Sequence, residues 1–436
     1  MPGPIGIRRE DKNIWERRVP LTPAHVKQLF DQFQVPTRIQ PFPKRAFSDD
    51  EFRAAKAEVA EDLSPCPVIF AVKEIPPALL LPQKTYLFFS HTIKGQRYNM
   101  PMLKRLLDLR CTLIDYECIK DANNQRLVFF GRFAGLAGML DGLYGLGQRL
   151  LALGLDSPFL HLKPALQYHD LEEAKTEIKK LGEEIRQKGL PSELTPLTIG
   201  FSGYGQVSKG AQEILDLLPH RQVQPDELLL PQTRPSAPII KTVFREQDMV
   251  EPIEPGYEFS LRDYYVHPLK YRSKFEKYLP QLDLLVNGIY WDERYPRLVT
   301  KDYLRKNYSA GRHPLKMIVD ISCDINGSIE ITEKATQPDM PAFVYNPSTD
   351  QITDGYQGEG IVNIAVDNLP AELPRDASAA FSNSLWSFVP AIYHADTTIP
   401  FADCHYPPEI KKAVIVHDGK LTPDFEYLRQ HLTGKI

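Results

Sequence analysis

Short apolar runs bounded by polar residues recur along the first third of the chain, and each predicts a buried strand. Residues 68–72 (VIFAV) and 86–90 (YLFFS) are the clearest examples, with a length and composition typical of inner strands of a parallel sheet. The first run leads directly into Lys73 and the second into His91. Because ligands of open α/β sheets gather beyond the carboxyl ends of the strands, we expect Lys73 and His91 to lie side by side at the mouth of a site.

These two side chains suit proton transfer. A lysine and a histidine form a workable acid–base pair near neutral pH when burial or neighbouring cations lower the lysine pKa. Arg18 lies in a turn that precedes a predicted helix, and its guanidinium can clamp a carboxylate through two hydrogen bonds. Taken singly, a lysine or histidine at such a position is usually a solvated strand end. The functional interpretation therefore depends on their occurrence on successive strands, together with Arg18 and a nucleotide-binding loop.

Strands and helices alternate through the rest of the first 130 residues. Thr22 and Pro23 predict a helix start, as N-cap and first helical residue, and the helix is expected to run to Phe33. Residues 131–153 predict a long helix whose glycines and alanines allow close packing, which favours a structural hinge between domains over chemistry. Further strands are expected at 3–7, 38–40, 111–117 and 127–130, and further helices from 48, at 174–187 and at 377–392, the last packing back on the first domain.

A second pattern, at 196–218, predicts a nucleotide-binding loop. Residues 196–202 (PLTIGFS) predict a strand, a glycine-containing loop follows, and 211–218 predicts a helix. This is the context that a dinucleotide-binding fingerprint requires, although serine stands where the third glycine is expected. The first glycine would make the tight turn, and the second would let a pyrophosphate approach the helix N-terminus. The candidate cofactor-binding residues here are Gly203, Tyr204, Gly205, Gln206, Val207 and Ser208.

Two more residues are candidates for contact with the ribose groups of the nucleotide. The next strand, 221–224, ends in Gln224, and Asp226 comes slightly late for the acidic ribose ligand expected about 20 residues beyond the loop. A neutral residue at this place removes repulsion against a 2′-phosphate, so the sequence favours NADP(H) over NAD(H). Asp320 ends another predicted strand, 316–322, where it either contacts the nicotinamide ribose or caps a turn.

Length and composition narrow the function classes. A chain of 436 residues is too long for one ordinary core, so two domains are expected. The net charge of −4, with both signs mixed along the chain, argues against a nucleic-acid surface, and no apolar run approaches the roughly 18 residues of a membrane span. The five scattered cysteines form no CxxC pair, and the eleven histidines show no HxH or HExxH spacing. We therefore expect no metal site and, since the N-terminus also lacks the apolar core of a signal peptide, a cytoplasmic location.

Several motifs together resemble a known family. They closely resemble the lysine–2-oxoglutarate reductase domain, the N-terminal half of the bifunctional aminoadipic semialdehyde synthases. More distantly, the chain is similar to lysine-forming saccharopine dehydrogenase, to alanine dehydrogenase and to the NAD-binding part of transhydrogenase. The resemblance covers nearly the whole chain, and the serine in the glycine loop belongs to the reductase pattern. The motifs are 8–11 (RRED), 15–18 (WERR), 89–94 (FSHTIK), 207–211 (VSKGA), 287–291 (NGIYW) and 367–371 (DNLPA).

The resemblance implies an α/β fold with two Rossmann-like domains and a cleft between them. The catalytic domain would comprise residues 1–134 plus 375–436, and the NAD(P)-binding domain residues 135–374. The implied reaction is L-lysine + 2-oxoglutarate + NAD(P)H + H⁺ ⇌ saccharopine + NAD(P)⁺ + H₂O. By the same resemblance, Lys73 and His91 are the acid–base pair, Arg18 holds a substrate carboxylate, Lys94, Gln96, Arg126 and Phe130 complete the substrate pocket, and Glu74 and Glu117 tune the pair.

The charges around Lys73 should set its working pH. Arg18 and Lys94 should lower the pKa of Lys73, while Glu74 and Glu117 should raise it. Two other functions stay open: a related dehydrogenase of the alanine or opine type, and a non-catalytic NAD(P)-sensing module. Because the glutamate-forming half of the bifunctional enzymes is not expected in this chain, functional pairing with a separate glutamate-forming saccharopine dehydrogenase is expected.

Overall fold

The computed structural model describes residues 3–230, 237–308 and 314–432, and the chain divides into two compact α/β units. Unit 1 comprises Met1–Phe130 and Pro374–Ile436, and unit 2 comprises Gly131–Leu373. The division expected from the sequence lay at 134/135 and at 374/375. Each unit contains an eight-stranded, mainly parallel sheet, which confirms the predicted fold class.

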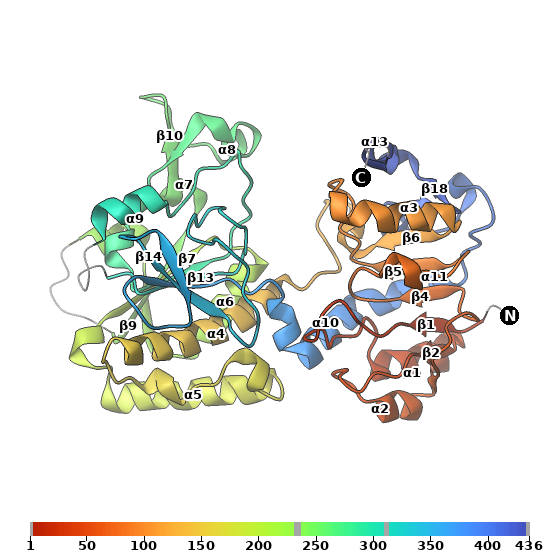
Figure 1. Ribbon diagram of the computed structural model, residues 1–436, viewed down its shortest axis with the longest axis horizontal. Helices are drawn as coiled ribbons and strands as arrows, with labels where there is room; N and C mark the ends of the chain where they lie inside the picture. Colours follow the sequence, from red (N-terminus) through yellow and green to blue (C-terminus); the bar gives the residue numbers. More distant parts are fainter. Residues whose placement is uncertain (1–2, 231–236, 309–313, 433–436) are drawn as a thin grey trace. The chain divides into compact units, whose positions relative to one another are not determined.

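The sheet of unit 1 is built on the two apolar runs that dominate the sequence. Its order is β18-β17-β6-β5-β4-β1-β2-β3, and the strands from β6 to β3 are parallel to one another (Figure 1). The two outer strands from the C-terminal segment are antiparallel. The strands are β1 (Ile5–Ile7), β2 (Thr37–Ile39), β3 (Glu58–Val59), β4 (Val68–Phe70), β5 (Thr85–Phe88), β6 (Thr112–Asp115), β17 (Val414–His417) and β18 (Lys420–Leu421).

Two helices of unit 1 begin where the sequence predicts. Thr22 is the extended N-cap of α1, which starts at Pro23 and ends at Phe33, and Ser48 caps α2 through a reciprocal capping box with Glu51. The helix expected at 377–392 is instead interrupted: α10 ends at Leu385 and α11 begins at Val389. Pro390, in the first turn of α11, cannot donate the backbone hydrogen bond that a continuous helix would need. The helices are α1 (Pro23–Phe33), α2 (Asp49–Ala54), α3 (Met100–Asp108), α10 (Pro374–Leu385), α11 (Val389–Tyr393), α12 (Pro408–Lys411) and α13 (Arg429–Leu432).

The prediction of a strand at 127–130 is wrong. Only a single bridge between Lys120 and Arg126 forms in this stretch. The sheet position beside β6 is already taken by β17, since Val416 of the returning C-terminal segment pairs with Leu113. Phe130 instead stacks its ring on that of Phe381, with centroids 4.6 Å apart.

The sheet of unit 2 has the order β15-β14-β16-β13-β12-β7-β9-β8. Its parallel part, from β16 to β8, follows the doubly wound arrangement in which ligands bind beyond the carboxyl ends of the strands. Two antiparallel strands complete one edge. The strands are β7 (Leu197–Ser202), β8 (His220–Val223), β9 (Ile239–Phe244), β12 (Leu284–Asn287), β13 (Met317–Asp320), β14 (Ala342–Asn346), β15 (Gln351–Asp354) and β16 (Ile361–Ile364).

Strand order in unit 2 bears on the prediction that Gln224 faces the ribose. The strand next along the chain after the glycine loop is β8, and the sequence suggested that it supplies the ribose-facing residue Gln224. In the structure β9 lies beside β7, and β8 is the edge strand beyond it. Gln224 is therefore a whole strand away from the strand that carries the loop.

Small residues let two helices of unit 2 approach closely, as their spacing predicts. A Cβ on Gly135 of α4 would lie 1.9 Å from the carbonyl oxygen of Val207, and one on Gly210 of α6 would lie 2.1 Å from that of Arg132. Both glycines are therefore required by the packing of α4 on α6 (Figure 1). The helices of this unit are α4 (Gly131–Ala152), α5 (Leu171–Lys188), α6 (Gln206–Leu215), α7 (Glu246–Met249), α8 (Leu261–Val266) and α9 (Lys301–Asn307).

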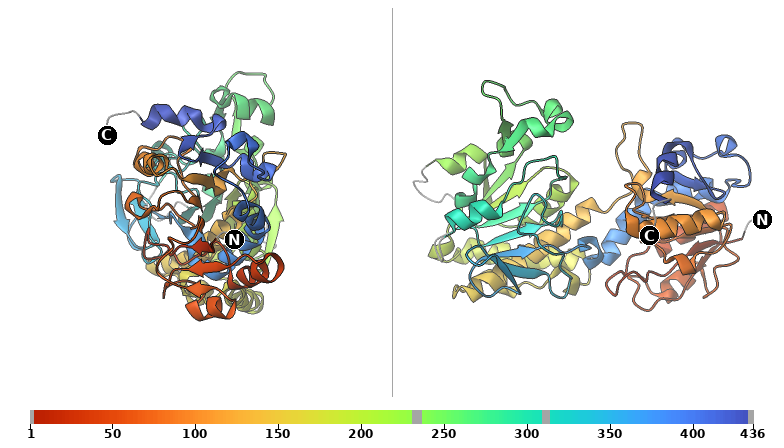
Figure 2. Two further views of the ribbon diagram at one scale, coloured as in Figure 1. Left: turned by 90° about the vertical axis from the view of Figure 1, so that its right-hand side faces the viewer. Right: turned by 45° about the horizontal axis from the view of Figure 1, so that its top comes forward.

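A small extension, drawn in green in Figures 1 and 2, projects from one end of unit 2. It consists of the antiparallel strands β10 (Val250–Pro252) and β11 (Tyr271–Ser273) with α8 between them. Within the described residues, none of the helices combines the length and the hydrophobicity needed to span a lipid bilayer.

Candidate active site

The structure brings Lys73 and His91 to the same edge of the unit 1 sheet. Strands β4 and β5 are parallel, with Phe70 opposite Leu87. Their pairing continues beyond the regular strands, because the backbone N–H of Phe89 donates to the carbonyl of Val72 at 3.0 Å. Lys73 follows Val72 directly, and His91 follows Phe89 after one intervening residue, Ser90.

Glu74 connects His91 to Lys12. Its carboxylate accepts a hydrogen bond from Nδ1 of His91 at 2.7 Å and from Nζ of Lys12 at 2.8 Å. Burial alone would raise the pKa of Glu74, but these two hydrogen bonds outweigh it and lower the pKa to about 2. Because this carboxylate is ionised at neutral pH, Nδ1 of His91 carries a proton and Nε2 is the nitrogen left for proton exchange.

The pKa of Lys73 is lowered, first by burial and second by the positive charge of Arg18. Lys12 adds to this effect, while Glu16 and Glu74 oppose it. The effects expected from Arg18 and Glu74 are thus found. Glu16 and Lys12, rather than Glu117 and Lys94, are the other charges that act on Lys73 most strongly.

Arg18 is buried and already binds a carboxylate of this chain. Its Nε and Nη2 donate to the two oxygens of Glu16 at 2.8 and 2.6 Å, and both side chains are almost fully buried. The guanidinium also lies 4.2 Å from the ring centroid of Phe130, which is within range of a cation–π interaction. The bidentate geometry predicted for a substrate carboxylate is therefore used by Glu16 in the structure.

Two buried carboxylates that the sequence analysis missed hold the backbone of the site. Glu10 accepts the N–H groups of Val72 and Lys73 at 2.7 and 2.9 Å, and burial, then the charge of Glu16, raises its pKa to about 7. Asp115, at the end of β6, accepts the N–H of Ser90 at 3.1 Å and the Ser90 hydroxyl. Burial raises the pKa of Asp115 to about 6. Glu10 lies inside a motif that the sequence singled out, but nothing in the local pattern shows that it reaches a strand 62 residues away.

The remaining substrate-pocket candidates differ in their surroundings. Glu117 and Arg126 form an ion pair at 2.5 Å, so the charge of each is balanced by the other. Lys94 is exposed. The side-chain oxygen Oε1 of Gln96 is buried and has no hydrogen-bond partner within the described part of the chain. A buried acceptor without a partner is costly, and a ligand N–H would satisfy it.

The glycine loop of unit 2 fits a dinucleotide phosphate. Gly203 has φ +86°, a left-handed conformation that favours glycine, and the space that a Cβ on Gly205 would occupy is open. Helix α6 begins at Gln206, and no side chain caps it. A cavity of about 260 Å³ opens at this loop, with Tyr204 in its wall. Open space, close backbone approach and an uncapped helix start together match the requirements of pyrophosphate binding.

Two other candidate cofactor-binding residues make hydrogen bonds within unit 2. Ser208 is buried, and its hydroxyl accepts a hydrogen bond from Gln212 at 2.9 Å, so the missing third glycine is compatible with the helix. Asp320 is fully buried, and its carboxylate accepts hydrogen bonds from Asn287, Ser322 and Thr332 at 2.6 to 2.8 Å. A contact between Asp320 and a ribose stays a prediction, and it would require one of these bonds to be exchanged.

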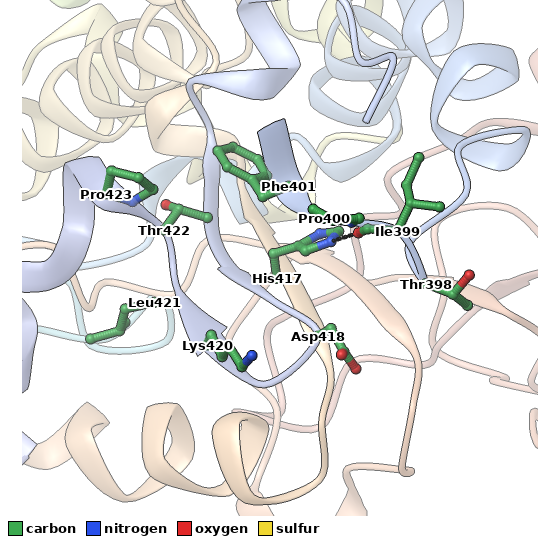
Figure 3. Close-up of a pocket in the computed structure, with 10 residues that line it drawn as sticks. All are labelled: Thr398, Ile399, Pro400, Phe401, His417, Asp418, Lys420, Leu421, Thr422 and Pro423. Carbon is green, nitrogen blue, oxygen red and sulfur yellow. Dashed lines mark hydrogen bonds between the residues drawn. The ribbon is translucent and has the colours of Figure 1, made fainter. Parts of the chain in front are cut away.

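Another cavity lies elsewhere in unit 1 (Figure 3). It has a volume of about 410 Å³, and Nε2 of His417 in its wall bonds the carbonyl of Ile399 at 2.9 Å. None of the candidate residues lines it. Its lining residues are Thr398, Ile399, Pro400, Phe401, His417, Asp418, Lys420, Leu421, Thr422 and Pro423.

Known proteins resemble this chain along almost its whole length. The alpha-aminoadipic semialdehyde synthase of Arabidopsis thaliana is 41% identical over 98% of this chain, and the mitochondrial enzyme of that name from Bos taurus is 37% identical over 98%. The chain covers only 41% and 47% of these relatives, so it spans less than half of their length. The lysine-forming saccharopine dehydrogenase of Yarrowia lipolytica is 27% identical, over 88% of this chain and 90% of its own length.

Comparison of structures and of family models leads to the same group. An L-alanine dehydrogenase superposes with a TM-score of 0.59 at 18% identity, covering 98% of this chain and 99% of the other. A transhydrogenase from Sinorhizobium meliloti gives 0.52 at 14% identity, covering 97% and 100%. The model of the alanine dehydrogenase/PNT N-terminal domain matches residues 6–137, and that of the C-terminal domain matches 260–424. The chain therefore belongs to the alanine dehydrogenase/PNT family and contains both of its domains.

Proposed function

We propose that this protein is a lysine–2-oxoglutarate reductase that forms saccharopine, with NAD(P)H as the reductant. The observation that carries the proposal is the cluster of Lys73, Glu74 and His91, in which a lysine of lowered pKa and a carboxylate-bound histidine follow two neighbouring parallel strands. The similarity to aminoadipic semialdehyde synthases and to lysine-forming saccharopine dehydrogenases supports this substrate pair.

In the proposed reaction, Lys73 and His91 move protons while the ε-amine of lysine adds to the keto carbon of 2-oxoglutarate. A lysine of lowered pKa is neutral more often at physiological pH, so Lys73 is suited to accept a proton from the attacking amine. His91, held through Nδ1 by Glu74, presents Nε2 to the oxygen that leaves as water. When bound, NAD(P)H supplies the hydride that reduces the resulting imine.

Substrate binding in unit 1 is assigned to residues around this pair. The cationic charge of Arg18 beside Lys73 would attract a substrate carboxylate, and Glu16 would then have to give up part of its bond to the guanidinium. Gln96 offers its buried Oε1 to a substrate N–H. In unit 2, the backbone of the 203–208 loop and the start of α6 would hold the cofactor pyrophosphate.

The test is the loss of NAD(P)H absorbance with the full chain, with L-lysine and 2-oxoglutarate each omitted in turn and with NADH and NADPH compared. Oxidation that requires both substrates supports the proposal. Oxidation with pyruvate and ammonia instead would assign the chain to alanine dehydrogenase activity. Nucleotide binding without turnover would favour a sensing role.

A matched pair of variants separates the proposed chemistry from fold. Lys73→Met should remove turnover, while Lys104→Met, which changes an exposed lysine on α3 of the same unit, should not. Turnover by Lys73→Met at the wild-type rate would refute the assignment. Consumption of saccharopine by a separate glutamate-forming dehydrogenase, and a cytoplasmic location, stay part of the proposal.

A further inference from the structure

The carboxyl end of β9 lies against the glycine loop. All six residues of β9 pair with β7, and the last pair is Ser202 with Phe244. The backbone N–H of Gly203 then donates to the carbonyl of Phe244 at 3.0 Å. In doubly wound nucleotide-binding sheets, the strand beside the loop-bearing strand is the one whose end reaches the adenosine ribose. In this chain that place belongs to Arg245 and Glu246, which follow Phe244, although both are absent from the sequence-based candidates.

Arg245 is an available cation at this place. It is exposed, and its guanidinium carbon lies 5.5 Å from the ring centroid of Tyr204, the residue between the two loop glycines. Its backbone N–H is fixed by the carboxylate of Asp248 at 2.8 Å. Among the described residues, no carboxylate lies within ion-pair distance of its side chain. The guanidinium therefore lies over the ring of Tyr204 at the loop, where its N–H groups are open to a ligand.

Glu246, the other charged residue at this place, is already hydrogen-bonded. Its carboxylate accepts the hydroxyl of Tyr265 at 2.6 Å and lines the same cavity of about 260 Å³. A carboxylate at the ribose favours the 2′-hydroxyl of NAD(H), whereas a guanidinium favours the 2′-phosphate of NADP(H), which it binds in a bidentate fork. Of the two residues, Arg245 is the one whose side chain forms no ion pair or carboxylate contact among the described residues.

We propose that Arg245 binds the 2′-phosphate of NADP(H) and gives this protein its preference for that cofactor. The inference rests on the proposed nicotinamide-nucleotide function, and it goes beyond it by naming the residue and the nucleotide. In this proposal Arg245, and not Gln224 at the end of the edge strand β8, decides between NADP(H) and NAD(H).

The test is a fluorescence titration of the full chain with NADPH and with NADH, which needs no turnover. Wild-type protein should bind NADPH more tightly. Arg245→Ala should lose about 10- to 100-fold in affinity for NADPH, as expected for a charge-assisted hydrogen-bonded contact, and less than about threefold for NADH. Arg245→Lys should recover part of the loss, because it restores the charge without the fork.

Gln224→Glu is the matched control. It places a carboxylate at the end of β8 and should leave the ratio of the two affinities unchanged, whereas Arg245→Glu should invert that ratio. Three results would each overturn this inference but not the proposed function: equal losses of affinity for both nucleotides in Arg245→Ala, no loss of affinity in that variant, or inversion of the affinity ratio by Gln224→Glu. Wild-type protein that binds neither nucleotide would overturn the proposed function and this inference with it.

Discussion

The buried carboxylate of Glu10 offers a direct test of how the Lys73 segment is held. Glu10→Gln keeps the size of the side chain but removes its charge and one of its acceptor oxygens. Because the carboxylate receives the N–H groups of Val72 and Lys73, the amide leaves one of these donors without a good acceptor. Relative to the ionised carboxylate, that loss costs about 1–3 kcal/mol. The charge itself adds a second effect that depends on pH.

The size of the pH-dependent effect follows from the pKa of Glu10, which burial raises from 4.5 to about 7. A raised pKa means that the folded state binds the proton more tightly than the unfolded state does. The contribution of Glu10 to the free energy of unfolding is therefore highest below pH 4.5 and falls as the pH rises, levelling off above about 7. At about 1.4 kcal/mol per pKa unit, the total is about 3 kcal/mol, of which roughly 2.5 kcal/mol falls between about pH 5 and about pH 8.

The assay is urea unfolding followed by tryptophan fluorescence. In a Trp291→Phe background the remaining tryptophans, Trp15 and Trp386, both lie in unit 1 and report on its unfolding. Between about pH 5 and about pH 8, the wild-type protein should lose roughly 2.5 kcal/mol relative to Glu10→Gln. Glu61→Gln, which changes an exposed carboxylate, should show no such drift. Other titrating groups cancel in the comparison, so a difference that drifts by less than about 0.5 kcal/mol would refute the reasoning.

Three further outcomes are expected. Lys73→Met should reduce kcat by about 10²- to 10⁴-fold with little change in the urea midpoint of unfolding, and a lowered midpoint would show instead that Lys73 is structural. Glu74→Gln removes a charge that raises the pKa of Lys73, so the limb of the kcat/KM profile governed by Lys73 should move to lower pH, and movement to higher pH would contradict the cluster. Gly135→Ala would place a Cβ 1.9 Å from the carbonyl oxygen of Val207. The substitution should destabilise unit 2 by about 3 kcal/mol or more and lower its Tm. An unchanged Tm would show that α4 and α6 need not pack so closely.

Local sequence signals predicted the elements that carry the site. The apolar runs before Lys73 and His91 form β4 and β5, because inner strands of a parallel sheet are buried on both faces and need apolar residues throughout. The caps of α1 and α2 and the turn at Gly203 are likewise decided within a few residues. Such features depend on hydrogen bonds and backbone conformations set by neighbouring residues, so they can be predicted from a single sequence.

The same local signals could not predict which strands pair when they lie far apart in the chain. Strand β8 follows the glycine loop in the chain, yet β9 occupies the place beside β7, and β17 joins β6 from about 300 residues away. These choices depend on which strand buries more apolar surface once the sheet assembles. Strand β9 is buried at nearly every position, while β8 is largely exposed and suits an edge. The position of Arg245 at the loop follows from that choice and has no local signature.

The buried acids at the strand ends also bear on how the chemistry must be measured. Backbone N–H groups beyond the last strand pair need acceptors where water is excluded, and a carboxylate can accept two of them, as Glu10 and Asp115 do. Burial raises their pKa values to about 7 and about 6, into the range in which a lysine–histidine pair would work. A pH profile of the wild-type protein would therefore mix proton transfer with loosening of the segments that hold Lys73 and His91. If Glu10→Gln flattens one limb of the profile without changing the rate at its optimum, that limb reports the support of Lys73 and not its chemistry. If the limb persists, it belongs to the acid–base pair itself.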